Sequence, residues 1–180
     1  LFDIYIDDNN FFECNHVSSK RITEPMITLV FVNDTITNCK LIDLLTEYTR
    51  RIPGDRDDNG IPRYKCCKCS NKNKESYTET SFYKLPPILI IQLKRYKHVE
   101  VEDKRRKIMT LTTKIISAEV EFDRYITLKE GTHSLAYYEL VSFNVFKGKG
   151  TTVNEGHYES YVLSPDKRWY NKNDDNKITE

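Results

Sequence analysis

The sequence predicts an α+β fold that is rich in antiparallel strands and contains one clear helix. Short β-branched or aromatic segments bounded by turn residues recur along most of the chain, which is typical of strands. A single segment, 39–50, instead places its apolar residues at helical spacing. Aromatic residues reach 12%, with twelve Tyr, and this content suits sheets that have one half-wet face.

The N-terminal part of the chain predicts two strands. Residues 1–6 alternate weakly between apolar and polar and are expected to form an edge strand. Residues 27–33 read Ile-Thr-Leu-Val-Phe-Val-Asn, a β-branched run between Pro25 and Asp34. Such a run between turn residues predicts a second strand.

The predicted helix follows. Its apolar residues recur at helical spacing, at Leu41, Leu44, Leu45 and Tyr48. Thr37 or Asn38 is a suitable N-cap, and Pro53-Gly54 ends the helix. Residues 53–63 are acidic and punctuated by Gly and Pro, so they are expected to form a loop.

The second half of the chain predicts further strands, at 76–83, 88–96, 137–146, 157–163 and 168–171, and residues 110–128 carry β-branched runs interrupted by charges. Residues 88–96 are apolar on both faces, which predicts a central strand with its prolines at the entrance. The charged segment 97–107 is expected to be a solvated connection. Residues 164–166 predict a turn between the last two strands.

Charge and hydropathy exclude several classes of protein. Charged residues make up 31% of the chain but the net charge is only +1, so no large field of one sign is expected. This argues against a partner that is nucleic acid or an anionic membrane. No apolar run reaches the length of a membrane span, and the N-terminus lacks the pattern of a secretory signal. The sequence therefore predicts a soluble protein.

Cysteine usage indicates the compartment. Five cysteines, three of them within four positions, make a poor disulfide framework for a secreted domain. A reducing compartment, cytoplasmic or nuclear, is favoured. Residue 1 is Leu and begins in the middle of a pattern, so we expect the chain to be an excerpt of a longer polypeptide.

The ending of the chain carries the chemistry of a hydrolase. His157 directly follows Gly156, which lets a substrate backbone approach closely. One strand later, Asn173 or Asp174 offers an oxygen that could accept a hydrogen bond from Nδ1–H and leave Nε2 as the base. A structural histidine beside an ordinary polar turn is the alternative interpretation, and the local sequence supports both equally. No nucleophile was found in the chain.

The cysteines predict a metal site, and here too a second interpretation stays open. Cys66-x-x-Cys69 has the spacing of half a tetrahedral zinc site. Upstream, Cys14 could join it, with His16 or Cys67 completing the set. A metal-free turn is equally weighted. Clustered thiols beside lysines fit metal ligation better than nucleophilic catalysis.

The order of these motifs resembles the ubiquitin-specific protease family. The specific parts are the strand Leu85–Tyr96, Leu-Pro-Pro-Ile-Leu-Ile-Ile-Gln-Leu-Lys-Arg-Tyr, and the ending Gly156-His-Tyr with Trp169-Tyr-Asn-Lys-Asn-Asp174. The stretch Cys14-Asn-His-Val-Ser-Ser-Lys-Arg, the helix, Tyr64-Lys-Cys-Cys-Lys-Cys and Tyr138-Glu-Leu-Val occur in the family's order. The resemblance spans nearly the whole chain.

The resemblance implies a papain-like cysteine hydrolase that cleaves the bond after the C-terminal glycine of ubiquitin. Residues 1–180 are then the C-terminal part of one catalytic domain, with 1–35 and 64–83 resembling its fingers and 87–180 its palm. Ubiquitin or ubiquitinated proteins are the implied partners. Loops at 97–107 and 147–156 would border the channel for the ubiquitin tail.

The resemblance also assigns roles to single residues. His157 matches the catalytic histidine, Asn173 the residue that orients it, and Asp174 the adjacent acid. Tyr158 and Gly156 match the residues beside the channel for the ubiquitin tail. Catalysis in the family requires no cofactor, and a structural zinc is implied at Cys14, Cys66 and Cys69, with His16 as a weaker ligand.

Four departures from the family pattern leave alternatives open. The nucleophile box of the family, Gly-Asn-Thr-Cys-like and on its thumb, does not occur here. Phe146 stands where the family commonly has His, Phe11 where it has a finger cysteine, and Lys172 where it has an apolar residue. A degenerate relative that binds ubiquitin without cleaving it is therefore one alternative. A zinc-ribbon protein that binds nucleic acid or acts as a scaffold is another, although the near-neutral charge argues against it.

Overall fold

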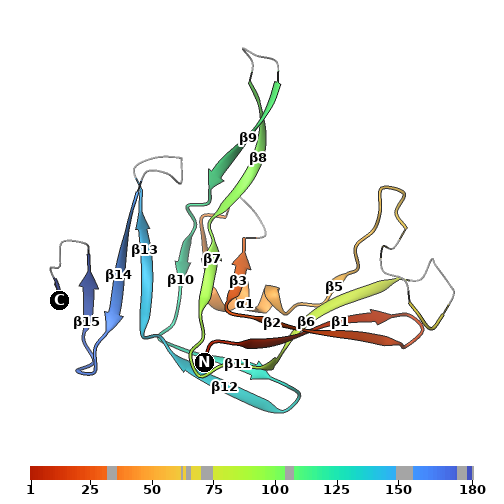
Figure 1. Ribbon diagram of the computed structural model, residues 1–180, viewed down its shortest axis with the longest axis horizontal. Coiled ribbons are helices and arrows are strands. Elements are labelled where there is room, and N and C mark those ends of the chain that lie inside the picture. The colour runs from red at the N-terminus through yellow and green to blue at the C-terminus, as the bar shows by residue number, and fades with distance from the viewer. Residues whose placement is uncertain are drawn as a thin grey trace. The chain divides into compact units, whose positions relative to one another are not determined.

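The computed structural model of the protein describes residues 1–31, 36–61, 63, 66–69, 75–103, 108–148, 156–173 and 178–179. The chain folds into two compact units, each built from segments that are distant in sequence (Figure 1). Unit 1 contains residues 1–29, 41–93 and 127–137, and unit 2 contains residues 30–40, 94–126 and 138–180.

A four-stranded antiparallel sheet dominates unit 1. Its strands are, in spatial order, β2 (Val17–Glu24), β1 (Ile4–Phe12), β6 (Ser76–Lys84) and β5 (Ile52–Pro53). Figure 1 shows β1, β2 and β6 as long strands lying side by side. Four β-branched or aliphatic side chains of this unit are fully buried and form its core, namely Ile4, Ile6, Ile27 and Leu29. Ile4 and Ile6 lie on the same face of β1, as the period of a strand requires.

The single helix of the described residues also belongs to unit 1. Helix α1 (Leu41–Tyr48) buries Leu44 and Leu45, and its Tyr48 ring stacks on Phe82 of β6 at 5.9 Å between centroids. The predicted helix is confirmed, but the expected N-cap is wrong because Asn38 already belongs to a strand that runs into the helix. Within the part of the chain that the structure describes, no helix is long and apolar enough to cross a membrane.

Two smaller sheets complete unit 1. Strands β3 (Ile27–Val30) and β7 (Ile91–Lys94) pair with each other, and β11 (Tyr125–Glu130) pairs with β12 (Ser134–Glu139). The β11–β12 turn contains Gly131 at φ 58°, a conformation that favours glycine.

Unit 2 holds the remaining strands. Short strands β4 (Asn38–Lys40) and β10 (Glu119–Glu121) pair in parallel, and β8 (Tyr96–Asp103) and β9 (Ile108–Ile115) form an antiparallel hairpin. A second sheet has the strand order β13 (Ser142–Lys147), β14 (His157–Leu163), β15 (Trp169–Lys172) and β16 (Ile178–Thr179). Figure 1 shows β13, β14 and β15 as adjacent blue strands.

Several predicted strands are confirmed, and others are corrected. Residues 76–83, 157–163 and 168–171 are strands with nearly the expected bounds. The expected solvated connection at 97–107 is wrong, because most of its described residues extend β8 into the hairpin with β9. The expected long strand at 137–146 is two strands, since β12 ends at Glu139 and β13 begins at Ser142.

The expected central strand at 88–96 is also wrong. Its regular part is only β7, which lies in a two-stranded sheet, and Ile88 and Ile90 are exposed. The prolines do precede the strand, as expected. The edge strand at 1–6 extends to Phe12 and is instead flanked on both sides, by β2 and β6.

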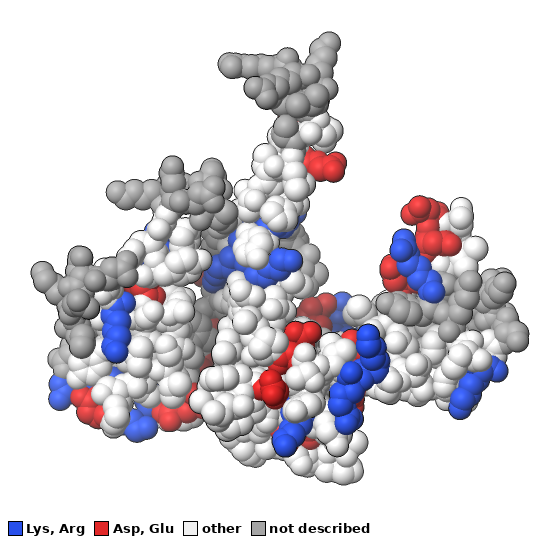
Figure 2. Space-filling model, viewed as in Figure 1, with Lys and Arg blue, Asp and Glu red and all other residues white. Residues whose placement is uncertain are grey.

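Charged side chains of both signs are scattered over the face of the molecule drawn in Figure 2, between larger areas of uncharged surface. This distribution agrees with the net charge of +1. On the described part of that face, no extended field of one sign is visible.

Candidate active site

The four-stranded sheet of unit 2 positions the two residues that the sequence singled out. His157 is the first residue of β14, and Asn173 directly follows the last residue of β15. The strands are joined by a tight turn in which Ser164 N–H donates to the Arg168 carbonyl at 2.9 Å. Lys167, at φ 66°, closes that turn. Because the turn fixes the antiparallel register, it returns residue 173 to the start of β14.

The side chains of His157 and Asn173 meet. Nε2 of His157 contacts Oδ1 of Asn173, sixteen residues along the chain. An amide Oδ1 can only accept a hydrogen bond, so Nε2 must carry the proton and donate it. The contact therefore selects one tautomer of the imidazole.

The ring nitrogen in this contact corrects the expected geometry. From the sequence, Nδ1–H is expected to face the orienting oxygen and Nε2 to be the base. In the structure the assignment is reversed, because the oxygen lies at Nε2. In the neutral ring the lone pair of a base is then on Nδ1.

Aromatic rings on the same face of the sheet hold the three strands together. The Phe143 ring of β13 stacks on Tyr161 of β14 at 4.9 Å between centroids, with 5° between their planes. Phe143 also contacts Trp169 of β15 and Phe122, each at 5.4 Å. This cluster ties together the strands that carry His157 and Asn173 and limits their relative movement.

Phe146 lies against the glycine that precedes His157. A Cβ atom on Gly156 would overlap the outer ring carbons of Phe146, so any larger residue here would force that ring to move. The Phe146 ring also contacts Tyr158, directly opposite on β14, at 5.0 Å between centroids. Tyr158 is 67% exposed, which leaves one side of its ring available to a partner.

A buried polar network on this sheet was missed by the sequence analysis. Glu159 is only 8% exposed, and its Oε2 accepts hydrogen bonds from Lys147 at 2.8 Å, Asn171 at 3.0 Å and Tyr161 at 3.3 Å. The hydrogen bond from Lys147, followed by that from Asn171, holds the pKa of the Glu159 carboxyl below its ordinary value. The sequence signal was the alternation that puts residues 157, 159 and 161 on one face of a strand.

The cysteine cluster lies in unit 1. Cys14 comes from the turn between β1 and β2, where Asn15 has φ 59°, and Cys66 and Cys69 come from a separate segment. Sulfur atoms of Cys14 and Cys66 are 3.4 Å apart, and Nδ1 of His16 is 3.2 Å from the Cys66 sulfur. The Sγ atoms of the three cysteines all lie within 4.8 Å of one another.

The three sulfur atoms fit three positions of a tetrahedral zinc ion in type and spacing. With usual Zn–S and Zn–N bonds, neighbouring sulfurs are about 3.8 Å apart, and sulfur and nitrogen about 3.6 Å. The observed distances are a few tenths of an ångström shorter. Cys67 is exposed and does not belong to the three-cysteine cluster. His16 is thus the better candidate for the fourth ligand.

The cluster favours the thiolate form of one cysteine. Burial by itself raises the pKa of the Cys66 thiol, but hydrogen bonds from the backbone N–H of Lys68 and Cys69 and from Cys14 and His16 outweigh it, and the pKa is about 6. The hydrogen bond with Cys14, then burial and the Cys66 sulfur, raise the pKa of Cys69 to about 11. Near neutral pH, Cys66 is therefore favoured as the thiolate and Cys69 as the thiol.

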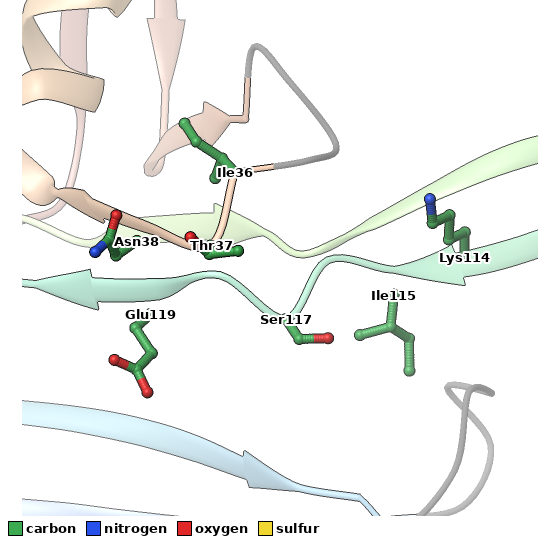
Figure 3. A pocket seen from close by; sticks show the side chains of 7 residues that line it. All are labelled: Ile36, Thr37, Asn38, Lys114, Ile115, Ser117 and Glu119. Atoms are coloured by element: carbon green, nitrogen blue, oxygen red, sulfur yellow. The ribbon is translucent and has the colours of Figure 1, made fainter.

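The remaining site predictions fall outside the described residues or outside these clusters. Asp174 lies outside the described residues, as do 104–107 and 149–155 of the two channel loops. A hollow of about 640 Å³ lies in unit 2 and is shown in Figure 3. None of the predicted site residues lines it, and its lining consists of Ile36, Thr37, Asn38, Lys114, Ile115, Ser117 and Glu119.

Comparison with known families decides which family the chain represents. The family model described as ubiquitin carboxyl-terminal hydrolase matches residues 60–180, more than half of the chain. The chain belongs to this family. The resemblance to ubiquitin-specific proteases, drawn from the order of the motifs, is confirmed.

Relatives within the ubiquitin carboxyl-terminal hydrolase family agree with this membership. Ubiquitin carboxyl-terminal hydrolase 8 of Saccharomyces cerevisiae is 29% identical over 124 residues, covering 62% of this chain and 24% of the relative. Ubiquitin carboxyl-terminal hydrolase nonstop of Drosophila melanogaster is 31% identical over 144 residues, covering 80% of this chain and 26% of the relative. The chain thus spans about a quarter of the length of these curated relatives.

Solved structures confirm the fold class. A structure of the yeast SAGA DUBm matches with a TM-score of 0.77 and 23% identity, covering 99% of this chain and 36% of that one. The SAGA Ubp8/Sgf11/Sus1/Sgf73 DUB module bound to ubiquitin aldehyde matches with a TM-score of 0.74 and 21% identity. The match covers 99% of this chain and 37% of that one. The expected α+β, antiparallel β-rich part of a papain-like protease is therefore the observed fold.

Proposed function

We propose that the protein containing this chain is a deubiquitinase that hydrolyses the bond after the C-terminal glycine of ubiquitin through a thiol. Membership of the ubiquitin carboxyl-terminal hydrolase family supports this proposal. The contact between His157 Nε2 and Asn173 Oδ1 is the observation that carries it, because a nucleophilic hydrolase needs an oriented base.

In the proposed mechanism, His157 accepts and returns one proton. Nδ1 of His157 takes the proton of a cysteine thiol that another part of the protein contributes, and the thiolate attacks the carbonyl carbon of the last glycine of ubiquitin. The imidazolium then protonates the leaving lysine amine as the C–N bond breaks. Water attacks the resulting thioester while His157 takes one of its protons, and His157 then gives this proton to the departing thiolate. The free thiol and the C-terminal acid of ubiquitin are released, and the acid loses its proton to solvent.

Asn173 keeps the ring in the tautomer that this sequence requires. Its Oδ1 accepts from Nε2–H in both the neutral and the protonated ring, so the contact persists through the proton transfers. Asp174 is proposed as the adjacent acid. Gly156 and the exposed ring of Tyr158 are proposed to border the path of the ubiquitin tail.

In this proposal, the parts of the chain correspond to the parts of the catalytic domain that the family resemblance implies. Residues 1–180 are the C-terminal part of one catalytic domain, with 1–35 and 64–83 as fingers that hold ubiquitin and 87–180 as palm. A cytoplasmic or nuclear compartment agrees with cysteines at 14, 66 and 69 that cluster as thiols without a disulfide among them.

A structural zinc at Cys14, Cys66, Cys69 and His16 is part of the proposal. The spacing of the three sulfur atoms supports it, as do the contact of His16 Nδ1 with the Cys66 sulfur and the low pKa of the Cys66 thiol. When bound, zinc would hold the β1–β2 turn to the segment 66–69. Catalysis itself requires no cofactor in this proposal.

A catalytically inactive ubiquitin-binding protein is the second candidate function. Phe146, which fills the space beside Gly156, favours it, because the family commonly carries a histidine at that position. The absence of a Gly-Asn-Thr-Cys-like box from these 180 residues does not separate the two candidates, since the chain spans only a quarter of its relatives.

The test is covalent capture by ubiquitin that carries a thiol-reactive group at its C-terminus. We expect the full-length protein to form a stable adduct of one ubiquitin per chain. Binding of ubiquitin without adduct formation would favour the inactive protein instead. Absence of both binding and capture would contradict both candidates.

A further inference from the structure

The buried network around Glu159 lies on the same face of the sheet as the His157–Asn173 pair. His157, Glu159 and Tyr161 alternate along β14, so their side chains share one face. Lys147 is directly opposite His157 on β13, and Asn171 is directly opposite Tyr161 on β15. Side chains opposite one another in an antiparallel pair also share a face.

Glu159 joins the three strands at this face. From β13, Nζ of Lys147 reaches diagonally to Oε2 of Glu159 at 2.8 Å. From β15, Nδ2 of Asn171 donates to the same carboxylate at 3.0 Å and to the Tyr161 hydroxyl oxygen at 3.2 Å. One buried oxygen atom therefore binds β13, β14 and β15 together, next to the residues that hold the imidazole.

The orientation of Asn171 depends on this carboxylate. Its Oδ1 is buried and accepts no hydrogen bond from the described residues, which is an unfavourable state for an amide oxygen. The two hydrogen bonds donated by Nδ2 offset that cost, and both lie on the Glu159 side. Asn171 is two residues before Asn173, so fixing Asn171 fixes the end of the strand from which Asn173 projects.

We propose that Glu159 is a positioning residue for the His157–Asn173 pair, acting through Asn171 and held by Lys147. The proposal rests on the function proposed above and adds a residue outside the motifs of that family resemblance. The ion pair itself adds little to stability, because the Lys147 side chain is 57% exposed. It does fix geometry, and an error of about 1 Å in the position of a catalytic group costs about a hundredfold in rate.

The experiment measures steady-state hydrolysis of a fluorescent amide of ubiquitin by the full-length protein. Glu159→Gln keeps the shape of the side chain and removes its charge. We expect kcat to fall about ten- to a hundredfold while KM stays within about threefold, because the loss affects the reacting groups and not ubiquitin binding. Glu47→Gln is the matched control, since Glu47 also loses an ion pair, with Arg50 at 2.7 Å, at helix α1 and away from the β14–β15 turn. The kcat of this control variant should stay within about twofold of the wild-type value.

A double-mutant cycle separates positioning from general loss of structure. If Glu159 acts through Asn173, Glu159→Gln should lower kcat by less than about twofold in a protein in which Asn173→Ala has already removed the orienting oxygen. An equal loss in both backgrounds would overturn the proposal, because it would mean that Glu159 only maintains the fold. No loss of kcat in the single variant would overturn it as well.

A second readout keeps this proposal distinct from the proposed function. In the protein labelled with ¹⁵N-histidine, the Nε2–H proton of His157, assigned by its loss in His157→Gln, reports the contact with Asn173. We expect Glu159→Gln to speed exchange of this proton with water by about tenfold or more. If wild type hydrolyses nothing but the exchange accelerates, the proposed function fails and the positioning role stands. Unchanged exchange overturns the positioning role in either case.

Discussion

The sulfur atoms of Cys14 and Cys66 lie 3.4 Å apart although 52 residues separate them in the sequence. One sulfur belongs to the tight turn between β1 and β2 and the other to the segment before β6. His16 and Cys69 complete a set of donors around the space between them. A metal ion that binds here would close a loop of more than fifty residues.

The first prediction is that the protein purified from cells carries one zinc ion per chain. Because the site is complete only in the folded state, removal of zinc by a chelator should lower the Tm by about 5 °C or more. Cys66→Ser and His16→Ala should each remove the metal. Cys67→Ser is the control and should retain it, since Cys67 is exposed and outside the cluster. Elemental analysis with thermal unfolding checks this, and full zinc content in Cys66→Ser would contradict it.

The second prediction concerns the thiols of the metal-free protein. The pKa of Cys66 is about 6, lowered from 9.0, so its thiolate form increases as pH rises through 6. Alkylation by iodoacetamide, followed by peptide mass analysis, should therefore modify Cys66 with a midpoint near pH 6. Cys69, with a pKa of about 11, should react little below pH 9.

The same shift affects stability with a defined sign. A thiol whose folded pKa is depressed contributes stability that is present above its unfolded pKa of 9.0 and is lost as pH falls through 6. Cys66→Ala should therefore flatten the pH dependence of unfolding between pH 6 and 9 in the metal-free protein. A Cys66 alkylation midpoint near pH 9 would show that the hydrogen bonds to its sulfur are absent in solution.

The third prediction tests why Gly156 is glycine. Gly156→Ala places a methyl group into the Phe146 ring and should destabilise the protein by about 1–3 kcal/mol, measured by urea unfolding. Phe146→Leu in the same chain should recover much of that loss, because the smaller side chain leaves room for the methyl group. If Gly156→Ala leaves stability unchanged but weakens ubiquitin binding, the glycine serves the substrate and not the Phe146 ring.

The fourth prediction concerns the ion pair of Lys147 and Glu159. Lys147→Met leaves a buried carboxylate without its charged partner and should destabilise the protein more than the double variant Lys147→Met/Glu159→Gln. Because the pKa of Glu159 is held below 4.5, its contribution to stability is present above 4.5 and is lost as pH falls below that value. Urea unfolding at pH 7 and pH 4 checks both statements. Equal stability of the single and double variants would show that Lys147 is not the partner of Glu159 in solution.

The sequence predicted the elements whose pattern is local. Helix α1 was predictable because Leu44 and Leu45 lie on one buried stripe. Strand β2 was not, since nearly all of its side chains are exposed and it has no alternating pattern. Strand β8 was missed for a different reason: valines alternate with Glu100 and Glu102 as in a strand, but the dense charge of the segment favoured a solvated connection.

The same distinction between local and long-range patterns applies to the candidate site. His157 and Asn173 could be paired from the sequence because a single turn joins their strands. The Lys147–Glu159 pair depends on the register of β13 with β14, which a long connection does not specify. The nitrogen that faces Asn173 depends on the orientation of the ring, which no spacing along the chain encodes.

The most direct test of the account is the hydrolysis of ubiquitin amide by full-length His157→Ala beside the wild-type protein. The account predicts that turnover falls by at least about a hundredfold, because the proton acceptor is lost, while the Kd for ubiquitin stays within about threefold. Wild-type turnover in His157→Ala would contradict the central claim that this imidazole is the base of a deubiquitinase.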